Sequence, residues 1–220
     1  MALKAKVMKQ FLTILICLCW FFGCGQQRTM DSVSLSQKCD SLRSVYGMQT
    51  KILYKNDVPF YVALSYFPEL KGLHIIVKES GIKTTLNVRP SIGSLLFRKR
   101  CKRTYIIRVN KQTGDSIISF SKLPFNAKIG ILGHEFNHIV DYNKRNLGGI
   151  LKRLISYSSA KTKAEYEKTI DSMTIKKGLG WQLYDWSYYV LYTSNAKQKY
   201  KTFKQNIYLK PEDILQLMRK

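Results

Sequence analysis

Residues 130–140 read GILGHEFNHIV, an apolar run without proline that contains the pentapeptide His134-Glu135-Phe136-Asn137-His138. Residues four apart lie on one face of a helix, so a helix here would direct His134 and His138 at a single ion. Glu135 would lie beside that ion without binding it, where its carboxylate could take a proton from metal-bound water. The stretch therefore predicts a helix that carries a catalytic metal site.

The sequence on either side of this helix predicts an α+β fold. Upstream, four short segments rich in β-branched and aliphatic residues are expected to be strands, at 73–77, 82–88, 105–109 and 116–120. The other segments with helical patterns are 34–46, 150–157, 162–177 and 181–192. Asn126 is expected to cap the central helix, 126–145, and Pro211 to open a last one. We expect a small, mostly antiparallel sheet followed by a helical half.

A catalytic zinc site needs a third protein ligand beside the two histidines. The metzincin continuation would place Gly at position 141 and His at position 144, but the chain has Asp141 and Lys144. The remaining histidine, His74, falls in a predicted strand and is interpreted as an ordinary strand residue. The third ligand is therefore expected to be a carboxylate on a following helix, where Glu165 and Glu167 are the candidates.

Glu167 and Asp171 form an E-x-x-x-D element, with Gly178 seven residues after the aspartate. Together with H-E-x-x-H, this element resembles the gluzincin clan of zinc peptidases, and within it the membrane-associated CAAX-processing and heat-shock proteases. The resemblance covers about residues 130 to 180, and Ile170 stands where that branch usually has alanine. It implies a zincin-like fold, a zinc cofactor, Glu167 as third ligand and Asp171 as the acceptor that orients a ligand histidine.

Asp141 lies on the same helical face as the two histidines, and two roles for it stay open. It could accept a proton from a ligand imidazole, or it could interact with the end of the helix beside Lys144. Glu165 stays the alternative third ligand. Both glutamates could also be a solvated helix surface that pairs with neighbouring lysines.

The resemblance also implies a mechanism, in which zinc activates a water molecule, Glu135 takes its proton, and the water hydrolyses a peptide bond. A tyrosine is expected to stabilise the oxyanion, and Tyr184, Tyr188 and Tyr189 are the candidates. In gluzincins an edge strand aligns the substrate by backbone pairing, and residues 105–109 are expected to supply it.

The first 23 residues are typical of an export signal, because three lysines precede a short apolar run. The run ends in Gly23-Cys24, which resembles the lipobox of bacterial lipoproteins and implies that Cys24 is lipidated. An uncleaved anchor is the alternative. We expect a signal peptide at 1–23, a tether at 24–36 and a zincin-like domain at 37–220, held on the membrane in the cell envelope outside the cytoplasm.

The chain has a formal net charge of +23, and its densest cationic run is residues 98–103. A surface this cationic favours an anionic membrane as partner. No pattern of a nucleic-acid-binding motif accompanies the charge, so nucleic acid is not expected. Cys39 and Cys101 could form a disulfide, but their positions in the sequence do not decide whether they lie close enough.

The leading hypothesis is a membrane-anchored zinc metallopeptidase that acts on peptide or protein substrates. The alternative is a non-catalytic zincin-like envelope lipoprotein that serves as a binding or structural module. A third, weaker hypothesis is a basic envelope-binding domain in which the pentapeptide is accidental. The oligomeric state is not predicted.

Overall fold

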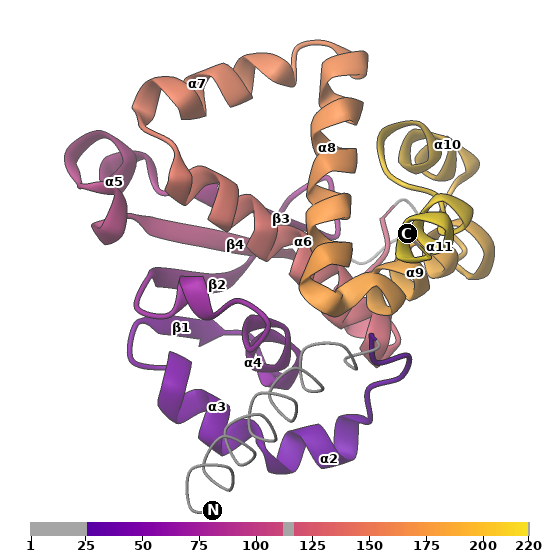
Figure 1. The fold of residues 1–220 in the computed structure, drawn as a ribbon, viewed down its shortest axis with the longest axis horizontal. Helices are drawn as coiled ribbons and strands as arrows, with labels where there is room; N and C mark the ends of the chain where they lie inside the picture. The colour runs from indigo at the N-terminus through magenta and orange to yellow at the C-terminus, as the bar shows by residue number, and fades with distance from the viewer. Residues whose placement is uncertain (1–25, 112–116, 220) are drawn as a thin grey trace, which may run out of the picture.

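The structure is a computed structural model that describes residues 26–111 and 117–219, and it has a mixed α+β fold (Figure 1). A four-stranded sheet occupies the first half of the chain, and the second half is helical. The expected signal peptide and the first two residues of the expected tether, Cys24 and Gly25, lie outside the described residues.

The sheet consists of β1 (Thr50–Leu53), β2 (His74–Ser80), β4 (Thr104–Asn110) and β3 (Leu86–Pro90), in that spatial order. β1 pairs with β2 and β2 with β4 in parallel, and only β3 is antiparallel to its neighbour. The prediction of a mostly antiparallel sheet was therefore wrong. A helix separates β1 from β2, and β3 with a helix separates β2 from β4, so both parallel pairs are joined by crossover connections.

Three further strand predictions need correction. Residues 105–109 form an interior strand, β4, flanked by β2 and β3, so this strand cannot offer a free edge to a substrate. The edge strand that lies beside the pentapeptide helix is β3. Residues 117–120 form no strand, and they lead into the single turn η3 (Phe120–Lys122). The segment predicted as 82–88 becomes a strand only from Leu86 onward.

The helices before α6 have six to eight residues, and those from α6 onward have eight to twenty. The first group is α2 (Ser32–Gln37), α3 (Cys39–Tyr46), α4 (Val58–Leu64) and α5 (Ile92–Phe97), with the single turns η1 (Pro68–Leu70) and η2 (Arg100–Lys102). The second group is α6 (Phe125–Lys144), α7 (Leu147–Ser156), α8 (Ala160–Thr174), α9 (Gly180–Tyr188), α10 (Gln198–Ile207) and α11 (Pro211–Met218). Two π-helical turns follow α8 and α9, namely η4 (Ile175–Leu179) and η5 (Tyr189–Thr193). Within the described ranges, no helix combines the length and apolar character needed to cross a membrane.

α6 is the central helix, with the sheet and α4 on one side and α8 and α9 on the other (Figure 1). The strand residues that alternate toward α6 are buried and belong to the same apolar core as α6 residues such as Leu132 and Phe136. α6 is buried along most of its length because it is enclosed on both sides, which explains the unbroken apolar run of residues 129–133 before His134.

Glycine allows α9 to approach α6 closely. A Cβ atom at Gly130 would overlap the carbonyl group of Gln182, and one at Gly133 would meet the side chain of Leu179. These glycines thus serve the contact with η4 and α9, which follow α8. At the end of α8, Gly178 has φ +84°, a conformation that other residues rarely adopt, and the chain turns there into α9.

The predicted cap at Asn126 was wrong, because α6 begins one residue earlier, after Pro124, and has no side-chain cap. The Asn126 side chain instead binds the N-terminal segment, accepting from the Met30 amide at 2.9 Å. Gln26 likewise binds the amide of Gly180 at 2.8 Å. The expected tether, 24–36, therefore includes residues that are held against α9. Cys39 is buried and Cys101 is exposed, and both are free, so they form no disulfide.

Candidate metal centre

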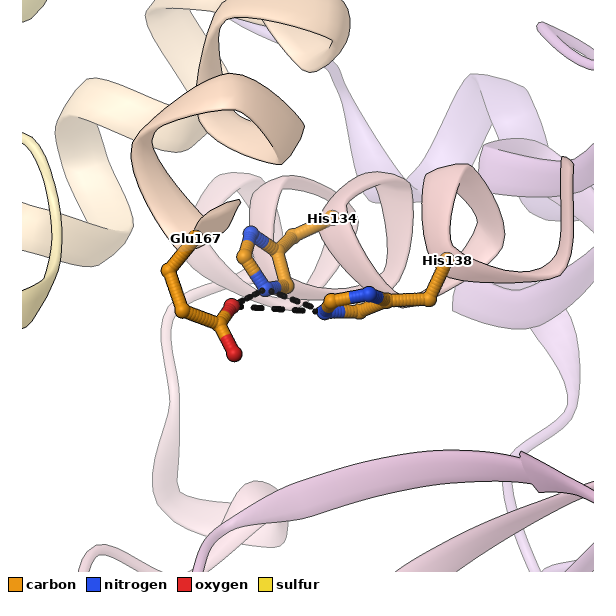
Figure 2. Close-up of side chains that lie close together, drawn as sticks. All are labelled: His134, His138 and Glu167. Atoms are coloured by element: carbon orange, nitrogen blue, oxygen red, sulfur yellow. Dashed lines mark hydrogen bonds and ion pairs between the residues drawn. The ribbon is translucent and has the colours of Figure 1, made fainter. Parts of the chain in front are cut away.

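Three side chains from two helices converge on one point (Figure 2). α6 supplies His134 and His138, and α8 supplies Glu167. The Oε2 atom of Glu167 lies 3.0 Å from His134 Nε2 and 3.3 Å from His138 Nε2, and the two Nε2 atoms are 3.0 Å apart. The three residues are 3–5% exposed. This arrangement could hold a metal ion.

The arrangement of the polar atoms in this cluster suits the ligands of a metal ion better than it suits hydrogen bonds among these atoms. Two imidazole nitrogens that face each other at 3.0 Å can share at most one proton. Glu167 Oε2 is buried and has no hydrogen-bond partner among the described residues. Ligand atoms around a tetrahedral ion with bonds of about 2.0–2.2 Å would lie roughly 3.3–3.6 Å apart. The observed separations differ from that by only a few tenths of an ångström.

Asp171 fixes the orientation of His134. Its Oδ1 lies 2.8 Å from His134 Nδ1, and its Oδ2 accepts a hydrogen bond of 2.9 Å from the amide of Leu209. A carboxylate at Nδ1 favours a proton there and leaves Nε2 free to bind a metal. Burial lowers the pKa of His134, but Asp171 and Glu167 outweigh burial and raise it to about 10. The metal-free site therefore holds a proton.

His138 is oriented through a tyrosine. Tyr166 donates a hydrogen bond of 3.1 Å to Asp141 Oδ2, so its oxygen can accept from His138 Nδ1 at 3.2 Å. Asp141 also pairs with Arg145 at 2.8 Å and with Arg153 at 3.3 Å. Asp141 thus contacts His138 only through Tyr166, and its ion pair with Arg145 lies at the end of α6.

Tyr157 orients the third ligand. Its hydroxyl donates a hydrogen bond of 2.6 Å to Glu167 Oε1, which leaves Oε2 directed at the histidines. Burial and the charge of Glu167 raise the pKa of Tyr157, so this hydroxyl keeps its proton. Burial would raise the pKa of Glu167, but the charges of His138 and His134 beside it hold it well below its usual range.

Glu135 lies next to the cluster and is buried, with 7% exposure. Burial raises its pKa, and the charges of His138 and His134 oppose that rise. A carboxyl group with a raised pKa, close to a possible metal ion and not among its ligands, is suited to proton transfer.

Other candidates from the sequence lie elsewhere. Glu165 is exposed, and the only hydrogen bond described for it is through its carbonyl oxygen, so it does not reach the cluster. His74 is in β2 and lines a shallow hollow with residues of β1. Tyr184 and Tyr188 stack along the outer side of α9. The structure does not bring these residues to His134 and His138.

The tyrosines that surround the cluster are others, namely Tyr142, Tyr157, Tyr166 and Tyr208. Tyr142 is four residues after His138, so helical spacing could have suggested it, whereas Tyr166 is adjacent to Glu167 and adjacent residues do not share a helical face. Tyr157 and Tyr208 come from segments whose position depends on tertiary packing. No local sequence signal points to them.

No protein-family model matches this chain, and searches among curated proteins and solved structures found no match.

Proposed function

We propose that this protein is a zinc metallopeptidase with a zincin-like fold. The observation that supports the proposal most strongly is the convergence of His134, His138 and Glu167, with Glu135 beside them and outside the ligand set. Two imidazole nitrogens and one carboxylate oxygen form the ligand set of a His2Glu catalytic zinc site, which leaves a fourth position for water. Thiolate ligands are absent from the cluster, so it does not resemble a typical structural site.

Bound zinc would supply Lewis acidity and would lower the pKa of a water molecule at the site. Glu135 is proposed to take a proton from the attacking water and to deliver it to the leaving amine. Asp171 and Tyr166 would hold the imidazoles with Nε2 toward the ion, and Tyr157 would hold Glu167.

Two further roles can be proposed. β3 is the edge strand beside α6, so it is a better candidate than β4 for pairing with the main chain of a peptide substrate. Tyr208 is the tyrosine whose ring lies 5.5 Å from that of His134. Burial and the charges of Glu167 and Glu135 raise its pKa, so its hydroxyl stays protonated and could donate to an oxyanion.

The sequence supports a location for this activity. The apolar N-terminal run and Gly23-Cys24 favour a lipid-anchored protein of the cell envelope, outside the cytoplasm. The net charge of +23 favours association with an anionic membrane. The proposed substrates are therefore peptides or proteins of the cell envelope.

One set of variants tests the activity. Wild-type protein, Glu135→Gln and the exposed control Glu165→Gln would be purified without chelators and measured for zinc content and for cleavage of a broad peptide library. We expect about one zinc per chain in all three, and cleavage by the wild type and Glu165→Gln only. Absence of zinc from the wild type would refute the metal assignment. Undiminished cleavage by Glu135→Gln would refute the mechanism.

One observation favours the non-catalytic alternative. The three ligand residues and Glu135 are all at most 7% exposed, so a peptide substrate has little access to them in this conformation. In that alternative zinc would bind and stabilise the fold, but no peptide in the library would be cleaved by any of the three proteins.

A further inference from the structure

Four aromatic side chains form a row along one side of α9 and η5. Trp181, Tyr184, Tyr188 and Tyr192 follow one another at helical spacing, with ring centroids 6.0, 5.8 and 5.0 Å apart. Exposure increases along the row, and Tyr188 and Tyr192 are 45% and 53% exposed. We call these four residues the aromatic row. None of them is needed by the proposed catalytic mechanism.

The N-terminal segment meets the aromatic row. The guanidinium carbon of Arg28 lies 4.6 Å from the ring centre of Trp181 and 5.7 Å from that of Tyr184. Arg28 also pairs with Asp185 at 2.9 Å, and Gln26 binds the Gly180 amide. The first described residues therefore lie against the start of α9, and Cys24, the proposed site of lipid attachment, precedes Gln26 by two positions in the sequence.

We propose that the aromatic row is the surface with which the folded domain contacts the lipid bilayer that holds its N-terminus. The proposal rests on the membrane attachment in the proposed function. Tyr and Trp side chains combine an apolar ring with a polar tip, and they are enriched where a bilayer meets water. Lys197 and Lys199, which are exposed and follow η5, would add attraction to anionic headgroups.

This contact would set the position of the metal centre. α9 packs directly against α6, and the axes of packed helices lie about 8–10 Å apart. A bilayer on the outer side of α9 would thus lie only one helix layer from the helix that carries His134 and His138. The substrates favoured by this arrangement are peptide segments close to the membrane surface.

The test measures which face of the bound protein touches lipid. Full-length protein, processed and lipidated at Cys24, would be reconstituted in phosphatidylglycerol vesicles with brominated or ordinary acyl chains, and a tryptophan would be added at Tyr192. The matched control is Leu154→Trp on α7, a residue that is 60% exposed and belongs to a helix on the other side of α8 (Figure 1). Both substitutions are at exposed positions, so neither is expected to disturb the core.

We expect brominated lipid to quench the fluorescence of the tryptophan introduced by Tyr192→Trp. The fluorescence of the tryptophan introduced by Leu154→Trp should stay unchanged. Equal quenching at both positions, or quenching at Leu154→Trp alone, would overturn the proposal. Failure of the full-length protein to float with vesicles would also overturn it, because it removes the bilayer from the argument. Zinc content and peptide cleavage, measured on the same preparations in detergent, report separately on the proposed function.

Discussion

Tyr157 donates a hydrogen bond of 2.6 Å to Glu167, and this bond decides which carboxylate oxygen of Glu167 faces the two histidines. Tyr157 directly follows α7, whereas Glu167 lies within α8. The metal centre therefore depends on a connection between two helices that the ligand motif itself does not include.

Replacement of Tyr157 by Phe should weaken zinc binding without removing it. Oε1 of Glu167 would lose its donor, and Glu167 could then rotate or bind with a different oxygen. Loss of such an orienting partner typically costs about 10–100-fold in metal affinity. Competition with a chromogenic chelator would measure the change, and Tyr192→Phe, which removes an exposed tyrosine hydroxyl bonded to Glu212, is the control. An unchanged zinc affinity in Tyr157→Phe would contradict the role of this bond.

Replacement of Glu167 by Gln should abolish tight zinc binding, whereas Glu165→Gln should leave it unchanged. The two residues are on the same helix, but Glu167 is 3% exposed beside the histidines and Glu165 faces solvent. A neutral amide is a much weaker ligand for zinc than a carboxylate. Metal analysis after gel filtration would compare the two. Loss of zinc in Glu165→Gln alone would mean that the third ligand has been assigned to the wrong residue.

Replacement of Asp171 by Ala should reduce both zinc affinity and stability. His134 would lose the acceptor at Nδ1, and the Leu209 amide would lose its partner. We expect about 10–100-fold weaker zinc binding and a loss of roughly 1–3 kcal/mol in the unfolding free energy of the metal-free protein. Calorimetric titration and urea unfolding measure these quantities. A variant that loses stability but keeps full zinc affinity would show that Asp171 only supports the fold.

The stability of the metal-free protein should depend on pH through His134. Its pKa is about 10 in the folded chain, above the 6.5 of an ordinary histidine. The protonated form is therefore favoured by folding, and its contribution is fully present below about pH 6.5 and lost as pH rises through 10. Urea unfolding at pH 7 and pH 10 should show a decrease of the order of a few kcal/mol. His134→Gln should lack this part of the decrease, and an identical pH dependence in both proteins would refute it.

Replacement of Gly130 by Ala should destabilise the fold, because the new methyl group would overlap the Gln182 carbonyl and push α9 away from α6. Overpacking of this kind costs about 1–3 kcal/mol. Gly148→Ala is the matched control in α7, where the nearest atom to an added Cβ is 3.8 Å away. Chemical denaturation should show a loss for Gly130→Ala and no loss for Gly148→Ala, since alanine favours helix. Equal stability of the two variants would contradict the close packing.

The parts of the site that could be predicted from the sequence are those that helical spacing controls. His134 and His138 are four residues apart on one helix, and Glu167 and Asp171 are four apart on another, so each pair shares a face. The resemblance to gluzincins supplied the assumption that the two faces meet. The structure places them together, with the carboxylate of Glu167 and not that of Glu165 at the cluster.

The sheet was predicted less well, because pairing depends on segments that are distant in sequence. The hydrophobic pattern located residues 73–77 and 105–109, but it contains no information about which strands are neighbours or how they run. β1, with the sequence TKIL, is too short and too polar to be recognised by periodicity. Tyr157 and Tyr208 were missed for a similar reason, since both reach the cluster through tertiary packing alone.

α7 has a consequence for how an ion would leave the site. Tyr157, at the end of this helix, holds Glu167, and Arg153 within it pairs with the Asp141 carboxylate that binds Tyr166. One helix is thus coupled to two of the three ligands through separate chains of contacts. A displacement of α7 would loosen both ligands together, so we expect Glu167 and His138 to release the ion in one concerted step.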